Sequence, residues 1–377
     1  MLAHPGSCRL RPVIALTLTV ACDQIAGIDD YRVGSKPTDA SAPITYLASP
    51  ACVQCIATKC AAQLTRCSEL EDCQAGYDCT RGCTDIACNR DCNLAWPADA
   101  IEGLRPLYTC TSEQCMEACN LGRNFTCVGR YTHPERYQLG EGVDIRIPVS
   151  VGDYPGTHAE GVRVTACSPA GFGWCEPPGV AETVVTDFAA TLALRMTPTG
   201  WYGAVDFTDE RSLVSGPDGG ALHSLLPAAK MHTSPLLGGG FDNDGMVLPT
   251  REIFEYYLSS SPTPTRFEPD RGYLQVLARD CNDNGARDLE LVLNPPQEGV
   301  WITYWGGSPE LPSWTLDRTT LAGKVSAGSL QPDQGVTVEL REKESGRVFS
   351  CAQVVPKSGA FVFLAMHPRS ESQPCTQ

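Results

Sequence analysis

The sequence predicts a mainly β protein, with two antiparallel β-sandwiches preceded by a small disulfide-rich helical domain. Two observations carry this prediction. Thirteen of the 76 residues from Cys52 to Cys127 are cysteine, and many of them recur at helical spacing. From about Val128 onward, apolar and polar residues alternate in short runs separated by Gly and Pro turns, which is typical of antiparallel strands.

Composition limits the function classes. The chain has 377 residues, of which 42% are hydrophobic, so it can bury cores in more than one domain. It contains 29 Lys and Arg and 44 Asp and Glu, which gives a formal net charge of -15. Nucleic-acid binding draws its affinity from clustered Lys and Arg that displace counterions. The acidic balance therefore predicts no nucleic-acid partner.

Residues 1–21 are predicted to be a signal peptide. Arg9 and Arg11 precede the apolar run from Val13 to Ala21, which is the order of charge and hydrophobicity in an export signal. A helix of this length is too short to cross the hydrocarbon core of a bilayer. We therefore expect an exported protein.

Cys22 follows this run directly. The segment Leu18 to Cys22, Leu-Thr-Val-Ala-Cys, resembles a bacterial lipobox, which implies that Cys22 becomes the first mature residue and carries acyl chains. Cysteine parity agrees, because loss of Cys8 with the signal and of Cys22 to lipid leaves an even number to pair. The alternative is ordinary signal cleavage with Cys22 left as a thiol. Residues 22–50 are the predicted tether, because most of the segment is rich in Ser, Thr, Pro, Ala and Gly.

Residues 51–127 are predicted to form the disulfide-stapled helical module. Three cysteine pairs are spaced i and i+4, which places both sulfurs on one face of a helix. These pairs are Cys79 with Cys83, Cys88 with Cys92, and Cys115 with Cys119. Two facing helices can be joined by an inner and an outer bridge, so we expect Cys92 to bond to Cys115 and Cys88 to Cys119. Spacing alone leaves other connectivities open.

Zinc binding is the alternative for this cysteine cluster. Structural zinc sites favour two Cys-x-x-Cys knuckles, or cysteines combined with histidine. Only Cys52 and Cys55 form such a knuckle, and no histidine lies between His4 and His133. In an exported chain, disulfides are the expected state. A redox-active Cys52 and Cys55 pair is not expected either, because the segment lacks the βαβ context of a thioredoxin fold.

The β region is divided into a first sandwich at 128–215, a long connection at 216–269 and a second sandwich at 270–377. In the connection, Thr250 precedes an amphipathic pattern that predicts one helix with Thr250 as its N-cap. Two disulfides are expected in these regions. Cys167 with Cys175 would close a short hairpin, and Cys281 with Cys351 would join two strands of the second sandwich.

An internal repeat connects the two β blocks. The first block contains Thr186-Asp187, a strand, Pro198-x-Gly200 and a second strand, and the second block contains Thr319-Thr320, Gly323, a strand, Pro332-x-x-Gly335 and a second strand. This order resembles the transthyretin-like β-sandwich modules found as carboxypeptidase regulatory-like domains. The resemblance covers about half of the chain and implies a spacer, a folding aid or a binding platform without catalysis. Ile25 to Tyr31 also resembles the start of many bacterial lipoproteins.

The familiar catalytic motifs are absent from the sequence. The five histidines after residue 21 form no His-Glu-x-x-His, and no Gly-x-Ser-x-Gly elbow, Walker loop or dinucleotide fingerprint occurs. We therefore expect a protein that is not an enzyme. A secreted hydrolase with a noncontiguous Ser, His and Asp site is an alternative, because such triads are recognised by geometry.

Two sets of residues are candidate ligand sites. Asp280, Asn282, Asn284 and Asp288, with Gly285, match the early positions of a calcium loop, although Leu291 stands at the twelfth position, where an EF-hand needs a carboxylate. Calcium is therefore the one cofactor considered, and the alternative is a plain Asn-Gly turn. The aromatic residues Trp301, Tyr304 and Trp305 share one predicted strand, where they serve either as a platform for sugar rings or as core.

These observations favour a non-catalytic, lipid-anchored protein of the bacterial envelope with an adhesion or scaffold role. The predicted partners are the membrane, through the lipid anchor, and surface glycans or envelope proteins. The location is the periplasm, the outer membrane or the cell surface. The alternatives are a carbohydrate- or calcium-binding surface module and the secreted hydrolase.

Overall fold

The computed structural model describes residues 49–83, 92, 104–130, 133, 135–151, 159–167, 174–175, 179–186, 189–208, 213–215, 222–237, 245–262, 265–281, 283–306 and 311–369. The predicted signal peptide, Cys22, Cys88 and Asn282 lie outside these ranges.

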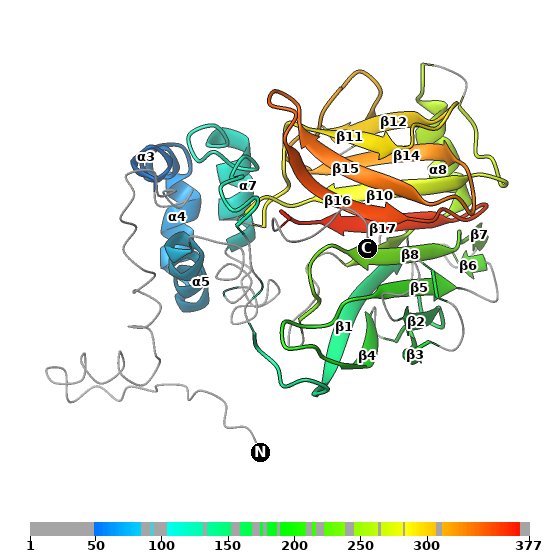
Figure 1. The fold of residues 1–377 in the computed structure, drawn as a ribbon. Helices are drawn as coiled ribbons and strands as arrows, with labels where there is room; N and C mark the ends of the chain where they lie inside the picture. The colour runs from blue at the N-terminus through cyan, green and yellow to red at the C-terminus, as the bar shows by residue number, and fades with distance from the viewer. Residues whose placement is uncertain are drawn as a thin grey trace, which may run out of the picture. The chain divides into compact units, whose positions relative to one another are not determined.

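The helical module begins the described structure. Its helices are α3 (Pro50–Lys59), α4 (Ala61–Ser68), α5 (Glu71–Gly82) and α7 (Leu104–Gln114), grouped together in Figure 1. Helix α3 starts where it does because the Ser49 hydroxyl accepts the Cys52 N–H at 3.1 Å and Pro50 suits the first helical position. Among the described helices, none is both long and apolar enough to span a bilayer.

Disulfides hold this module together. The described bridges are Cys52–Cys119, Cys55–Cys115, Cys60–Cys110, Cys67–Cys73 and Cys79–Cys92. Cysteines also make up seven of the twelve buried residues in the module's core cluster. Cross-links therefore replace much of the apolar core that so short a segment cannot supply.

The connectivity predicted from cysteine spacing is wrong. Cys115 and Cys119 do form an inner and an outer bridge, but their partners are Cys55 and Cys52 of α3 rather than Cys92 and Cys88. The i and i+3 spacing in α3 also puts both sulfurs on one helix face, so it serves this purpose as well as an i and i+4 pair. Cys92 is bonded instead to Cys79.

The β region is built on one nine-stranded sheet with the order β13-β12-β14-β10-β17-β8-β5-β2-β3. These strands are β2 (Arg163–Cys167), β3 (Ala181–Val184), β5 (Ala204–Thr208), β8 (Ala228–His232), β10 (Gly272–Ala278), β12 (Trp301–Gly306), β13 (Leu311–Ser313), β14 (Lys324–Leu330) and β17 (Phe361–Met366). Strands from both predicted sandwiches therefore belong to the same sheet.

Two smaller sheets complete the β region. The sheet β4-β1-β9 contains β1 (Gly142–Val151), β4 (Ala189–Arg195) and β9 (Met246–Leu248), and the sheet β11-β15-β16 contains β11 (Leu289–Asn294), β15 (Val336–Glu342) and β16 (Val348–Val354). A two-stranded ribbon pairs β6 (Leu213–Ser215) with β7 (Leu222–Ser224). Helix α8 (Arg251–Ser259) has Thr250 as its N-cap, as the sequence predicts.

The two cores lie on opposite faces of the nine-stranded sheet. In β17, Phe361 belongs to the core shared with β4-β1-β9, whereas Val362 and Leu364 belong to the core shared with β11-β15-β16. Successive residues of a strand point to opposite faces, so one strand can serve both cores.

The sheet is mixed, which differs from the antiparallel arrangement predicted. Strand β17 lies between β10 and β8 and runs parallel to both, as Figure 1 shows for the red strand between its yellow and green neighbours. Strands β1 and β9 are also parallel. Period-two alternation reports which face a residue takes and carries no information on the direction of the neighbouring strand.

The segment after α7 docks onto the turn that follows β10. Cys127 is bonded to Cys281, the Asn124 carbonyl accepts the Cys281 N–H at 2.8 Å, and the Gly122 carbonyl accepts the Arg287 N–H at 2.8 Å. The predicted Cys281–Cys351 bridge is therefore wrong, and Cys351 is bonded elsewhere. Cys167 is bonded to Cys175, the pair expected from the sequence.

Candidate functional site

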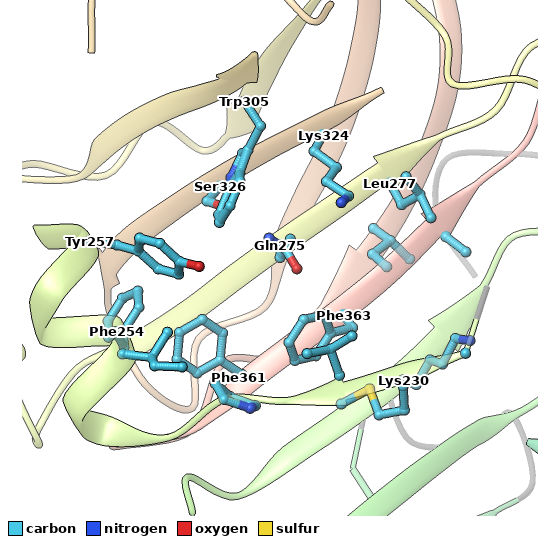
Figure 2. A pocket seen from close by; sticks show the side chains of 17 residues that line it. Lys230, Phe254, Tyr257, Gln275, Leu277, Trp305, Lys324, Ser326, Phe361 and Phe363 are labelled. Atoms are coloured by element: carbon cyan, nitrogen blue, oxygen red, sulfur yellow. The ribbon is translucent and has the colours of Figure 1, made fainter. Parts of the chain in front are cut away.

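A cavity of about 210 Å³ lies on the uncovered part of the nine-stranded sheet, beside α8. Its floor comes from β12, β14, β10, β17 and β8, and its wall comes from α8 and the β9 segment. Figure 2 shows Trp305, Tyr257, Gln275, Lys324 and Phe363 arranged around it.

Strand register places these side chains on one face. Gln275 of β10 is paired with Ser326 of β14 on one side and with Phe363 of β17 on the other, and Phe363 is paired with Lys230 of β8. Directly paired residues share a face, so these four side chains form a row across the sheet. The alternate residues of the same strands, such as Val276, point into the other core.

Trp305 and Tyr257 form an aromatic corner. Their ring centroids are 5.2 Å apart and the planes meet at 76°, an edge-to-face arrangement. The Trp305 indole Nε1 donates to Ser326 Oγ at 2.8 Å, and Thr320 Oγ1 donates to the Trp305 carbonyl at 2.7 Å. The indole is therefore fixed in orientation while its ring stays half-buried at the cavity edge.

Helix α8 positions Tyr257. Thr250 caps the helix by accepting the Ile253 N–H at 3.3 Å. Phe254 then anchors it, with ring centroids 4.6 Å from Phe361 and 4.8 Å from Tyr273. Tyr257 lies three residues after Phe254, so it projects from nearly the same side of the helix, toward Trp305.

The polar side chains of the described residues that line the cavity are cationic or neutral. Lys324 Nζ lies 6.0 Å from the centroid of the Trp305 ring, a cation–π distance, and Lys230 contributes a second ammonium. In Figure 2 the Tyr257 hydroxyl, the Gln275 amide and the Lys324 ammonium are directed toward the middle of the sheet face. Among the described residues that line the cavity, none is Asp or Glu. The arrangement can stack a ring and hydrogen-bond an acceptor.

The structure separates the three aromatic residues proposed from the sequence. Trp305 lines the cavity. Trp301 packs on the core shared with β4-β1-β9, and its ring centroid lies 5.5 Å from that of Trp314. Tyr304 points to the opposite face, where its hydroxyl accepts the Leu291 N–H at 3.0 Å and burial raises its pKa. These two residues are core, which was the alternative interpretation.

Sequence reasoning missed the polar members of the site. Gln275 interrupts an apolar strand, and Lys324 and Ser326 alternate with Val325 and Ala327 in another, and these patterns were the available signal. Their convergence required the strand order, which brings β10, β14 and β17 together from distant parts of the chain.

Two of the residues proposed for calcium, Asp280 and Asp288, have structural partners. Asp280 is fully buried, with Oδ1 accepting the Asn284 N–H at 3.0 Å and Oδ2 accepting the Asn124 N–H at 3.3 Å. Asp288 forms an ion pair with Arg123. Within the described residues, no group of three or more His, Cys, Asp or Glu side chains is placed to hold a metal ion. The Asp280 carboxylate therefore stabilises the turn after β10, onto which the segment after α7 docks.

Ser234, His367 and Asp283 are aligned as in a hydrolytic triad. Ser234 Oγ lies 2.9 Å from His367 Nδ1, and His367 Nε2 lies 3.3 Å from Asp283 Oδ1. However, Ser234 is 1% exposed and His367 is 2% exposed. A nucleophile must reach its substrate, so this buried arrangement joins three segments of the fold rather than forming an open active site.

Comparisons with known proteins give no family. No protein-family model matches the sequence, and no curated protein matches it.

Among solved structures, the Bacillus anthracis TIE protein matches 60% of this chain and 34% of its own, with 11% identity and a TM-score of 0.18. The matched region thus spans about a third of that protein. A streptococcal ancillary pilin matches 60% of this chain and 68% of its own, with 9% identity and a TM-score of 0.17. The family 26 carbohydrate-binding module of Eubacterium rectale Amy13K, solved with maltoheptaose, matches 61% of this chain and 98% of its own, with 9% identity and a TM-score of 0.18. Scores this low carry no argument about this chain.

Proposed function

We propose that this protein is a non-catalytic component of the bacterial envelope that is exported and acts in adhesion or as a scaffold. The observation that carries the proposal is the state of the cysteines. Every cysteine in the described residues is disulfide-bonded. Disulfides form and persist in oxidising compartments and are rare in the cytosol. A chain built on so many of them is suited to a location outside the cytoplasm.

The proposal also includes a lipid anchor, a tether and partners at the cell envelope. The lipid on Cys22 attaches the chain to a membrane, and residues 22–50 serve as the tether. The helical module and the β region are then held away from the membrane surface. Surface glycans or envelope proteins are the proposed partners. The absence of catalysis is proposed because the aligned Ser234 and His367 are enclosed in the fold.

Intact mass of the exported protein, measured with and without reduction, tests this proposal. The expected mature chain begins at Cys22, carries the mass of acyl chains, and gains the mass of two hydrogen atoms for each bridge when the bridges are reduced. A Cys22→Ser variant should leave the membrane fraction and keep its disulfides. An unprocessed chain, or a chain whose mass does not change on reduction, would contradict the proposal.

Binding of a small ligand is a second candidate function, favoured by the corner of Trp305 and Tyr257. Aromatic side chains with a free face stack against ring-shaped ligands such as sugars. Tyr257→Ala should abolish binding on a glycan array. Tyr256→Ala is the matched control, because the adjacent Tyr256 is 69% exposed and does not line the cavity. Equal binding by the two variants would count against this site.

A further inference from the structure

Three cysteines meet at the end of α5. Cys79 lies in the last turn of the helix, and Cys83 is its C-cap residue, four positions later. Cys79 is bonded to Cys92, and Cys83 Sγ lies 3.5 Å from Cys92 Sγ. The i and i+4 spacing of Cys79 and Cys83 favours one side of the helix, so both can reach the same third residue. The Cys92 sulfur therefore touches both of the others, one through a covalent bond and one without.

The contact between Cys83 and Cys92 joins two separate disulfides. Cys83 is itself disulfide-bonded, and its partner is neither Cys79 nor Cys92, because those two are bonded to each other. An S–S bond measures about 2.05 Å, so the two sulfurs need to approach by only about 1.5 Å to form a new bond. Exchange between the two bridges thus requires little movement of the chain.

Burial separates the point of entry from the point of exchange. Cys83 is 3% exposed and Cys92 is 2% exposed, whereas Cys79 is half-buried. A thiol from solvent therefore meets the Cys79–Cys92 bridge at Cys79. The contact between Cys83 and Cys92 needs no access from solvent, because both reacting sulfurs belong to the protein and already touch.

We propose that these three residues form a thiol–disulfide exchange site, whose substrate is an external thiol. In the first step the external thiolate bonds to Cys79 Sγ, the Cys79–Cys92 bond breaks, and Cys92 leaves as a thiolate. In the second step Cys92 Sγ bonds to Cys83 Sγ, and the former partner of Cys83 leaves as a thiolate and takes a proton from water. One external thiol is consumed and one protein thiol is formed, so the number of disulfide bonds does not change.

Cys79→Ser tests the second step by itself, because it leaves a thiol on Cys92 beside the Cys83 sulfur. The exported variant is unfolded in guanidinium chloride with excess N-ethylmaleimide, which blocks thiols before they exchange further, and is digested with trypsin without reduction. Arg81 and Arg90 place Cys83 in a different tryptic peptide from Cys79 and from Cys92. We expect a new bond between Cys83 and Cys92, assigned by peptide fragmentation, and a blocked thiol on the former partner of Cys83.

Cys67→Ser is the matched control. It also leaves one thiol in α5, at Cys73, by removing the partner to which Cys73 is bonded. The blocked thiol should be found on Cys73, and the Cys79–Cys92 bridge should be intact. This control separates exchange at the proposed site from exchange of any thiol in the helical module.

Reduced glutathione tests both steps in the unaltered protein, so the inference stays testable if Cys79→Ser fails to fold. The folded, exported protein is treated with glutathione and mapped in the same way. We expect glutathione on Cys79 and a bond between Cys83 and Cys92 in the same molecules.

The inference would be overturned by a folded Cys79→Ser protein in which Cys92 carries the blocked thiol and Cys83 keeps its original partner. In the unaltered protein, a Cys79–Cys92 bridge that glutathione leaves intact would have the same meaning. So would release of Cys79 and Cys92 while the bond of Cys83 is retained. Exchange of the Cys73 thiol in the control would show that reactivity is not specific to this site, and would also overturn the assignment.

Discussion

Cys127 of the helical module is bonded to Cys281 of the β region, 154 residues later in the chain, with Cα atoms 5.9 Å apart. The hydrogen bonds between Asn124 and Cys281 and between Gly122 and Arg287 lie beside this bridge. Gly122 has φ +71°, and a Cβ there would lie 2.4 Å from the Gly285 carbonyl oxygen. Covalent and steric constraints therefore fix the module against this turn.

Removing the Cys127–Cys281 bridge should destabilise the protein more than removing a short-range bridge. A disulfide restricts the unfolded chain, and the effect grows with the length of the closed loop. Replacing both cysteines by Ala should cost about 2–5 kcal/mol in the free energy of unfolding, measured with urea. The matched control replaces Cys67 and Cys73, whose bridge closes a separation of only 6 residues. An equal or larger loss in the control would contradict the loop-length account.

The ion pair between Glu117 and Arg287 should contribute to acid stability. Arg287 is 6% exposed and donates two hydrogen bonds to the Glu117 carboxylate. These hydrogen bonds lower the pKa of Glu117 below 4.5. The folded pKa is depressed, so the stabilisation is present above the unfolded pKa and is lost as the pH falls through the folded pKa.

Glu117→Gln tests this ion pair. It should lower the urea midpoint at pH 7 and make the midpoint fall less steeply at acidic pH. Glu113→Gln, at an exposed position one turn earlier, is the control and should leave the decrease in the midpoint at acidic pH unchanged. If both variants show the same pH profile, the pair does not link the module to the β region.

Asp206 should have the opposite dependence on pH. Its side chain is buried, its Oδ2 accepts the Cys175 N–H at 2.7 Å, and burial raises its pKa from 3.8 to about 6. The folded state then holds this proton more tightly than the unfolded state. Stability is greatest below pH 3.8 for this group and falls as the pH rises through about 6.

Asp206→Asn should therefore be more stable than the unaltered protein at pH 8, by up to about 3 kcal/mol. Between pH 4 and pH 6 its urea midpoint should change less. Asp144→Asn, on the exposed face of β1, is the comparison and should not alter the pH dependence. A less stable Asp206→Asn protein at pH 8 would show that the carboxylate is stabilising.

The helix cap at Thr250 should control the aromatic corner. Thr250→Ala removes the acceptor for the Ile253 N–H and should cost about 1 kcal/mol of stability. The loss frays the start of α8, so Tyr257 should also be less well fixed against Trp305. Thr250→Ser keeps the acceptor and is the control. Urea unfolding gives the cost, and tryptophan fluorescence reports the corner; identical behaviour of the two variants would contradict the cap.

Local patterns in the sequence predicted much of the fold. The alternation of apolar and polar residues after Val128 predicted a region built from strands, and Thr250 with its amphipathic pattern predicted α8. These signals are local, because a strand or helix that buries one face shows its own period. The hairpin bridge Cys167–Cys175 was equally accessible, since only eight positions separate the two residues.

Long-range relationships could not be predicted in this way. The partners of Cys115, Cys119 and Cys281 depend on which helices and turns meet in space. The candidate site also depends on contacts between distant parts of the chain. Trp305 was identified as an aromatic candidate, but its neighbours Tyr257 and Lys324 are brought to it by α8 and by the order of the sheet.

Peptide mapping of the exported protein under non-reducing conditions tests the central claim most directly, because that claim is a stapled helical module fixed to the β region in an oxidising compartment. Our account predicts one cross-linked peptide that contains Cys127 and Cys281, released into two by reduction. Free thiols at these positions, or a bond from either residue to another cysteine, would contradict it.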